Sequence, residues 1–181
     1  MSMIERIETK RLLGDSLLEL ARGTQFEKIT AAQITRNCSL ARRTLYYHFD
    51  GKLALGAWVH TEEMASHVNP GLFTKPIVHL WADCLEALRA NDFLYRAIFR
   101  YPEVTRVAQR DTAQWVLSCI EHYDQALVVN EEIVFTAEFY ARSVTGVITH
   151  WLHDPQGLSP SDVSRGLRAI MPPALEPFHI L

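Results

Sequence analysis

Helix start and stop signals follow one another along nearly the whole chain and leave little room for any other element. Thr30-x-x-Gln33 has the spacing of a capping box, in which two side chains satisfy free backbone N–H groups at a helix start. Ser159-Pro160 places a capping residue before a proline at the first helical position. No segment shows the sustained alternation of apolar and polar residues that predicts a strand. The sequence therefore predicts an all-α fold.

The same signals set the expected helix boundaries. A further capping box, Ser2-x-x-Glu5, opens the first helix, and Gly23 ends it. Turn clusters such as Asn69-Pro70-Gly71 separate the later helices. The expected helices cover about residues 2–22, 30–37, 41–48, 51–68, 76–90, 92–100, 102–127, 131–153 and 160–170.

Charge is divided unevenly between the two ends of the chain, although the net charge is only −3. Residues 1–52 carry nine Lys/Arg against six Asp/Glu, whereas residues 53–181 carry nine against fifteen. A basic front and an acidic rear are typical of a nucleic-acid-binding head on a body with another task. We therefore expect a three-helix domain at residues 1–50 and a helical domain at residues 51–181.

Two simple features bear on the cellular compartment. The longest stretches without Asp, Glu, Lys or Arg are eleven residues, below the roughly 20 apolar residues that a membrane-spanning helix needs. Cys38, Cys84 and Cys119 are odd in number and far apart, which favours free thiols over disulfides. The sequence predicts a cytoplasmic protein with no membrane partner.

The segment 30–52 carries the strongest functional pattern. Two short helices flank a break at Cys38-Ser39, which is the helix-turn-helix layout whose second helix enters the major groove of DNA. Arg42 and Arg43 stand at the start of that second helix and can each donate two hydrogen bonds to a guanine edge. The aromatic run 46–49 is open to a second interpretation as plain core. Four consecutive residues cannot share one face of a helix, so part of the run is expected to be exposed.

This segment closely resembles the signature of the TetR family of bacterial transcriptional regulators. Its helix-turn-helix ends in a Thr-Leu-Tyr-x-His-Phe-x-x-Lys string, which Thr44 to Lys52 match. The resemblance covers about residues 5–55 and implies double-stranded operator DNA as a partner. It implies base contacts by Arg42, Arg43 and Thr44 and a mixed role for Tyr46. It implies phosphate contacts by Tyr47, His48 and Lys52, while Thr30 caps the supporting helix near the DNA backbone. The implied DNA-binding residues are Thr30, Arg42, Arg43, Thr44, Tyr46, Tyr47, His48 and Lys52.

The chain also departs from the family pattern. Ser39 stands in the turn where the family usually has glycine, and Ala41 stands at the next cap where it usually has serine. Ala31 and Ala32 leave the front of the supporting helix without a long polar side chain. A shifted turn would alter the docking angle on DNA. A co-activator or protein-interaction module of the same fold that no longer binds DNA is therefore kept as the alternative function.

The helix expected at 131–153 is apolar on two faces, and a helix of this kind needs cover on both sides. Phe135 and Phe139 lie on one of these faces. The TetR resemblance implies that the last two helices form a homodimer, although a central core helix without a partner would show the same pattern. The residues expected in the dimer interface form the other stripe, Ile133, Ala137, Ala141, Val144, Ile148 and Trp151.

Aromatic residues in the body suggest a place for a small-molecule effector, which the resemblance also implies. We expect an apolar cavity among the helices at 51–68, 76–90 and 102–127. Plain core packing is the alternative for each of these aromatics. The segment 93–100, together with Trp151-Leu152, weakly resembles a subgroup that includes dihydroxyacetone kinase operon activators. The expected pocket residues are Trp58, Trp81, Trp115, Tyr123 and Phe139.

Catalytic and metal-binding patterns are weak by comparison. The sequence has no Gly-rich phosphate loop, nucleophile elbow or metal-ligand motif. His60, Glu63 and His67 share one helix face, but no second cluster supports a metal site. We expect no enzyme activity, no metal and no cofactor. The predicted function is a sequence-specific DNA-binding transcriptional regulator, acting as a repressor that a small-molecule effector releases.

Overall fold

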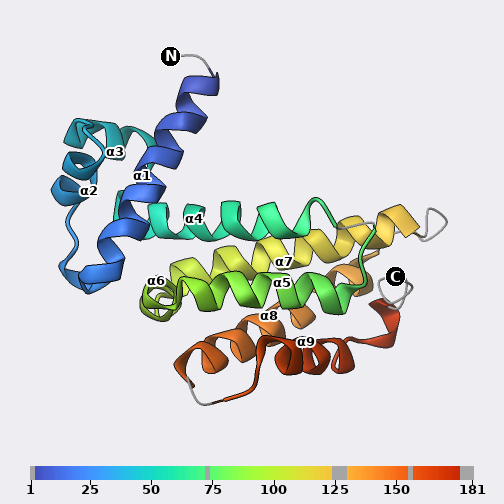
Figure 1. Cartoon of the computed structure of the whole chain (residues 1–181). Helices are drawn as coiled ribbons and strands as arrows, with labels where there is room; N and C mark the ends of the chain where they lie inside the picture. The colour runs from blue at the N-terminus through green and yellow to red at the C-terminus, as the bar shows by residue number, and fades with distance from the viewer. Residues whose placement is uncertain (1–2, 72–73, 124–129, 155–156, 176–181) are drawn as a thin grey trace.

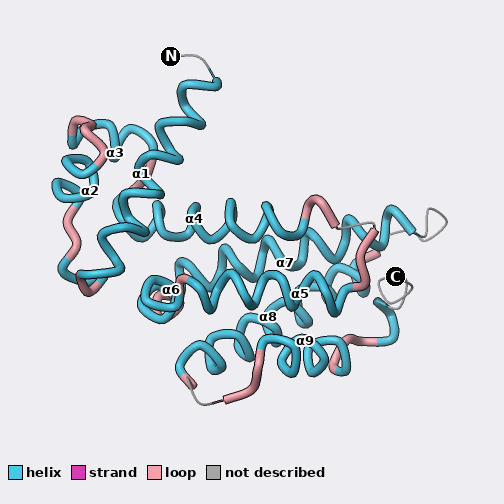
Figure 2. Tube along the Cα trace, viewed as in Figure 1, coloured by secondary structure: helices cyan, strands magenta, loops and turns pink. Residues whose placement is uncertain are grey.

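The computed structural model describes residues 3–71, 74–123, 130–154 and 157–175, and within these ranges it contains helices and loops but no strand (Figures 1 and 2). This confirms the all-α prediction. The capping box expected at Ser2 and the end of the helix expected to reach 127 lie outside the described residues. The helices are α1 (Met3–Gly23), η1 (Phe26–Lys28), α2 (Ala31–Asn37), α3 (Arg42–His48), α4 (Gly51–Val68), α5 (Ile77–Ala90), α6 (Asp92–Ile98), α7 (Pro102–Tyr123), α8 (Glu131–His153) and α9 (Pro160–Ala169).

The helices form a small projecting head and a larger body (Figure 1). In the head, α2 packs against α1 and α3, and the N-terminal part of α1 extends away from the body. In the body, α4 packs against α5 and α7, α7 packs against α8, and α5 packs against α9. Because α1 also contacts α4 and α6, it is the element that joins the two parts.

The core of the head is built from the apolar face of α1. Leu13 and Leu17 are fully buried, and so are Ile34 of α2 and Leu45 of α3. Burying a leucine or isoleucine side chain stabilises a fold by roughly 1.5–3 kcal/mol. The Ser16 hydroxyl adds a polar tie by donating to the backbone oxygen of Ile34 at 2.7 Å. Both short helices of the head are therefore fixed against α1.

The contact between head and body is close. A Cβ atom added at Gly14 of α1 would lie 3.1 Å from the Trp58 ring and 3.1 Å from the Val59 side chain, both of α4. On the other side of the head, the rings of Phe26 and Tyr101 approach to 6.2 Å between centroids. The glycine therefore lets α1 lie directly on α4, so that the two helices share one packed seam.

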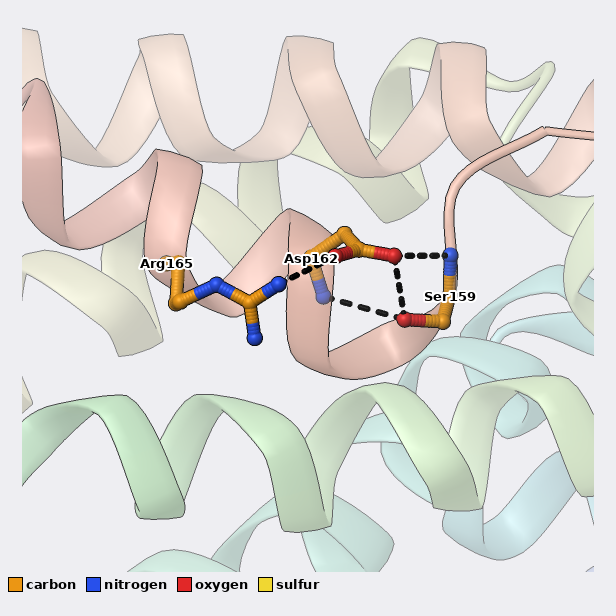
Figure 3. Close-up of polar contacts among 3 residues, drawn as sticks. All are labelled: Ser159, Asp162 and Arg165. Carbon is orange, nitrogen blue, oxygen red and sulfur yellow. Dashed lines mark hydrogen bonds and ion pairs between the residues drawn. The ribbon is translucent and has the colours of Figure 1, made fainter.

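The start of α9 shows the predicted cap in full (Figure 3). The Ser159 hydroxyl accepts from the backbone N–H of Asp162, and the Asp162 carboxylate accepts from the Ser159 N–H, both at 3.2 Å. The Ser159 hydroxyl also donates to this carboxylate at 2.6 Å, and Arg165 donates to its other oxygen. These bonds, the Ser159 hydroxyl first, lower the pKa of Asp162. The Ser159 cap is confirmed, and Asp162 completes a capping box that the sequence analysis did not predict, so that the start of the helix packed on α5 is fixed.

The face of α8 predicted to form a dimer interface is instead core, and that prediction is wrong. Its six residues are at most 7% exposed because α8 turns this stripe toward the rest of the body. Trp151 additionally donates its indole N–H to the backbone oxygen of Leu158 at 2.7 Å. The buried residues are Ile133, Ala137, Ala141, Val144, Ile148 and Trp151.

The opposite face of α8 is the exposed one. Phe135 is 64% exposed and Phe139 is 57% exposed, while Val147 further along the helix is 40% exposed. A Cβ atom added at Gly146 would meet nothing within 4 Å. The helix therefore presents two phenylalanines and a small residue outward.

The aromatics predicted to surround one effector cavity do not come together, so that prediction is also wrong. Phe139 points out of the body, whereas Trp81 is buried in the core and Trp115 packs partly against it. Trp58 instead lines a groove between α1 and α4. The side chain of Tyr123 lies outside the described residues.

Two smaller predictions concern the rest of the chain. The three cysteines are free thiols, as predicted. No helix in the described part of the chain is long and apolar enough to cross a bilayer.

Candidate nucleic-acid interface

The turn between α2 and α3 keeps a left-handed geometry without glycine. Ser39 has φ 56°, the only positive φ at a non-glycine residue among those described. This conformation costs roughly 1–2 kcal/mol at a residue with a Cβ atom. The Leu40 N–H donates to the Thr35 oxygen at 2.7 Å and closes the turn. The departure from the family pattern at Ser39 therefore leaves the turn in the left-handed form that glycine usually adopts.

The supporting helix α2 begins with the predicted capping box. The Gln33 N–H donates to the Thr30 hydroxyl oxygen at 3.2 Å, and the Thr30 N–H donates to the Gln33 side-chain oxygen at 2.8 Å. The next cap residue, Ala41, makes no side-chain bond at the start of α3. The packing of Leu45 into the head therefore does more than a cap to hold α3 in place.

The outer face of α3 carries the side chains predicted to meet DNA. Arg42 and Arg43 are exposed, and the rings of Tyr46 and Tyr47 are 52% and 63% exposed. The Arg42 guanidinium lies over the Tyr46 ring, 5.7 Å from its centroid. Since Leu45 and Phe49 face the core, the aromatic run is split between the two sides of the helix, as the sequence predicted.

A hollow beside α3 adjoins its outer face, and we call the outer face and this hollow together the recognition surface. This groove, of about 320 Å³, is lined by Arg43, Thr44, Tyr47 and His48. Four of the eight predicted DNA-binding residues thus border one groove, and Arg42 and Tyr46 lie exposed on the same short helix. Thr30 lies at the start of α2.

Lys52 has an internal role that the sequence analysis missed. Its ammonium group donates to three backbone oxygens, those of Phe26 at 2.7 Å, Ile29 at 2.8 Å and Glu27 at 2.9 Å. It also lies 4.7 Å from the centroid of the Phe26 ring. Burial lowers the pKa of Lys52. A phosphate contact would require one of these bonds to be exchanged, because an ammonium has only three N–H donors.

A second groove adjoins α3 on the side of α1, about 520 Å³ in volume. The Arg6 guanidinium of α1 donates to the Tyr47 hydroxyl at 2.9 Å across this groove. The ring nitrogen Nε2 of His48 is buried there without a hydrogen-bond partner in the structure. Burial lowers the pKa of His48, and the positive charges of Lys10 and Arg6 lower it further. The sequence analysis did not single out these α1 cations, although their i, i+4 spacing places them on one face.

Comparison with known proteins settles the fold. No protein-family model and no curated protein sequence matches the chain. Among solved structures, the dihydroxyacetone kinase operon activator DhaS superposes with a TM-score of 0.65 at 14% identity, covering 91% of this chain and 94% of its own. The TetR family repressor AlkX from Dietzia sp. strain DQ12-45-1b gives 0.63 at 17% identity, with 91% and 96% covered. A TetR transcriptional regulator from Rhodococcus sp. RHA1 gives 0.63 at 15% identity, with 96% and 97% covered.

The chain has the TetR fold. The match extends over head and body together, so the body, which resembled the family only in its overall helical architecture, is TetR-like as well.

Polar contacts tie α4 to its neighbours in the TetR-like body. The Glu63 carboxylate of α4 accepts from the Tyr95 hydroxyl and, at 2.8 Å, from the Asn91 amide. The Thr61 hydroxyl donates to the buried Asp111 carboxylate of α7 at 2.6 Å. Because both oxygens of Glu63 have protein partners, this residue ties α4 to α6. No set of three or more metal-ligating side chains gathers anywhere in the described residues.

His60 lies in the same TetR-like interior. It is 5% exposed, and its ring packs edge-on against Tyr95 and Phe99 at centroid distances of 5.8 and 5.1 Å. Its Nδ1 atom has no hydrogen-bond partner in the structure. Burial lowers the pKa of His60 to about 4, against a smaller opposing effect of Asp111. The body therefore contains a buried polar group that its own chain leaves unsatisfied.

Proposed function

We propose that this chain is a sequence-specific DNA-binding transcriptional regulator, and that it is not an enzyme. In this proposal residues 1–50 form the DNA-binding domain, and residues 51–181 form the effector-binding and dimerisation domain. The observation that carries it is the outer face of α3, where Arg42 and Arg43 are exposed beside two exposed tyrosines. No ion pair with a carboxylate occupies either arginine within the described ranges. An exposed, unneutralised face of this kind suits the major groove.

Each side chain of this face has a distinct part in the proposal. Arg42 and Arg43, at the start of α3, reach base edges and read sequence, with Thr44 beside them. Tyr47 and His48, at the other end of the helix, contact phosphate oxygens and set the register without reading bases. Lys52 stabilises the loop that precedes α2.

Replacing Arg42 or Arg43 with alanine should weaken binding to the operator by roughly 5- to 150-fold, because a bidentate arginine–guanine contact contributes about 1–3 kcal/mol of discrimination. Binding to a scrambled duplex should change much less. The measurement is a titration of each variant against DNA from the intergenic region upstream of its gene and against the scrambled duplex. Arg100→Ala, at an exposed position between α6 and α7, is the matched control. If the wild-type chain binds neither duplex, the alternative of a protein-interaction module holds.

We further propose that the regulator is a homodimer held by the outward face of α8 together with α9. Phe135 and Phe139 expose large apolar rings there, and Gly146 allows a second helix to approach closely. Exposed apolar residues on either side of α9, Leu158 before it and Ile170 after it, extend the surface. Helix-turn-helix regulators commonly bind two half-sites through a two-fold dimer, so a dimer would match the recognition surface.

Introducing a charge at this face should break the dimer. Phe139→Glu buries an unpaired carboxylate in the proposed interface, and we expect the dimer dissociation constant to rise at least tenfold. Sedimentation velocity across micromolar concentrations measures it, with Leu12→Glu, at an exposed apolar position of α1, as control. A wild-type monomer at these concentrations, or a Phe139→Glu variant that sediments like the wild-type dimer, would contradict the proposal.

The proposal includes release of DNA by a small-molecule effector, which would make the protein a repressor. Its support is the unsatisfied Nδ1 atom of His60 inside the body, since a ligand could supply the missing partner. The contact of Gly14 with Trp58 and Val59 would carry a shift of α4 to the head. A panel of small aromatic and aliphatic compounds tests this. An effector should raise the melting temperature and weaken binding to the operator together, and a panel without such a compound would count against effector release.

A further inference from the structure

The groove between α1 and α3 joins the recognition surface. Its lining residues are Arg6, Ile7, Lys10, Tyr47 and His48. Tyr47 and His48 also line the groove that opens beside Arg43. The two hollows therefore lie on either side of the same two side chains, and a duplex seated on α3 would pass over both.

Two positive charges face this second groove without an anion. Arg6 donates to the neutral Tyr47 hydroxyl, and its guanidinium lies 5.8 Å from the centroid of the Tyr47 ring. The Lys10 ammonium lies over the rings of Phe49 and Trp58, at 5.6 and 6.0 Å from their centroids. Neither cation forms an ion pair with a carboxylate among the residues that the structure describes.

Like charges that line one groove repel each other, and a bound anion would relieve the repulsion. Burial is the main cause of the lowered pKa of His48, and the charges of Lys10 and Arg6 lower this pKa further, so both cations act on the third side chain of the groove. Phosphate is the anion that suits the groove, because guanidinium, ammonium and phenol groups are all donors to phosphate oxygens. Continuity with α3 favours the phosphate of a DNA backbone over a free phosphate ion.

From this geometry we infer that Arg6 and Lys10 each bind a backbone phosphate of the duplex beside those that α3 contacts, so that the DNA footprint extends onto α1. The inference rests on the proposed DNA-binding function. Arg6 has a second effect, because its hydrogen bond to Tyr47 holds that hydroxyl at the edge of the recognition surface. The charge of α1, and not only that of the helix-turn-helix, then contributes to the affinity for DNA.

The experiment measures how binding depends on salt. Each phosphate that a cation neutralises contributes about 0.9 to the slope of log Kobs against log salt concentration. Arg6→Gln and Lys10→Gln keep polar side chains and remove the charges, so each should reduce the slope by about one unit per bound protomer, and the double variant by about two units per bound protomer. The reduction should be the same on operator and scrambled duplexes, since phosphate contacts do not read sequence. The matched control is Arg11→Gln, which lies on the same helix but lines the groove toward α4.

Other outcomes have defined meanings. Tyr47→Phe removes the hydroxyl that Arg6 holds but no charge, so it should lower affinity without changing the slope. If Arg6→Gln lowers affinity with an unchanged slope, Arg6 only positions Tyr47, and the inferred phosphate contact is overturned. If Arg42→Ala and Arg43→Ala behave as proposed while the double variant keeps the wild-type slope, the inference fails and the DNA-binding function stands. If inorganic phosphate at millimolar concentration binds the groove in the absence of DNA, the groove is a site for free phosphate and the assignment to the duplex is overturned.

Discussion

Replacing Lys52 with methionine should lower the free energy of unfolding by about 3 kcal/mol. Hydrogen bonds that involve a charged group contribute about 1.5–3 kcal/mol each, and the three bonds here come from a single ammonium group, so their effects will not add in full. Methionine keeps much of the side-chain volume but leaves the oxygens of Phe26, Glu27 and Ile29 without their donor. The loop between α1 and α2 would lose its link to α4.

Urea unfolding at neutral pH measures this change. Lys28→Met is the matched control, because Lys28 lies in the same loop with an exposed side chain. The titration against DNA separates the two interpretations of Lys52. A Lys52→Met variant that is as stable as wild type but loses about one unit of salt slope would return Lys52 to the phosphate contact that the sequence predicted.

Acid should destabilise the body through His60. The pKa of His60 is about 4 in the folded chain because of burial, whereas an unfolded histidine titrates near 6.5. At pH values between these two pKa values, His60 is protonated in the unfolded chain and neutral in the folded chain. The free energy of unfolding therefore falls as the pH falls. The loss begins below about pH 6.5 and reaches about 3 kcal/mol near pH 4.

Urea unfolding at several pH values between 7 and 4.5 tests this in wild type and in His60→Leu. Carboxylates also begin to titrate in this range, so the informative quantity is the difference between the two proteins. His60→Leu should remove the part of the pH dependence that His60 causes, and His79→Leu, at an exposed histidine of α5, should not. Parallel pH profiles for wild type and His60→Leu would show that His60 accepts a proton without penalty in the folded chain.

The sequence predicted the helices and the recognition surface because both depend on local information. Capping residues such as Thr30 and Ser159 act within one turn of the helices they open, and the structure confirms both caps. The short helix η1 was missed because three residues are too few to leave a periodic pattern. The exposed tyrosines of α3 were expected since four consecutive aromatics cannot all be buried on one helix.

The errors have a common physical origin in long-range contacts. Periodicity shows that Ile133 and Ala137 share a face of α8, but only the neighbouring helices decide whether that face or the one with Phe139 is buried. Lys52 finds its acceptors 23 to 26 positions earlier in the chain, in a loop whose path the sequence pattern does not reveal. Arg6 was missed for the same reason, because the Tyr47 hydroxyl to which it donates lies 41 positions away in the chain. Side-chain contacts between segments that are far apart in the sequence can be identified only when the fold is known.

Because α1 packs closely on α4 at Gly14, a change in the angle of α4 would tilt α1 as a rigid rod. The helix has 21 residues and is therefore about 30 Å long; Gly14, near its middle, packs on α4, and its N-terminal part lies beside α3 and extends away from the body. A tilt of about 5° at one end would displace the other end by about 3 Å, as the length of the helix dictates. The two heads of a dimer must span half-sites about 34 Å apart, so such a displacement in each head would spoil the fit to both half-sites at once. Rotations of α4 that are too small to disturb the packing of the body would then cause large displacements at the surface of DNA. Because Gly14 lets α1 pack tightly on α4, a rotation of α4 would pass directly to the head.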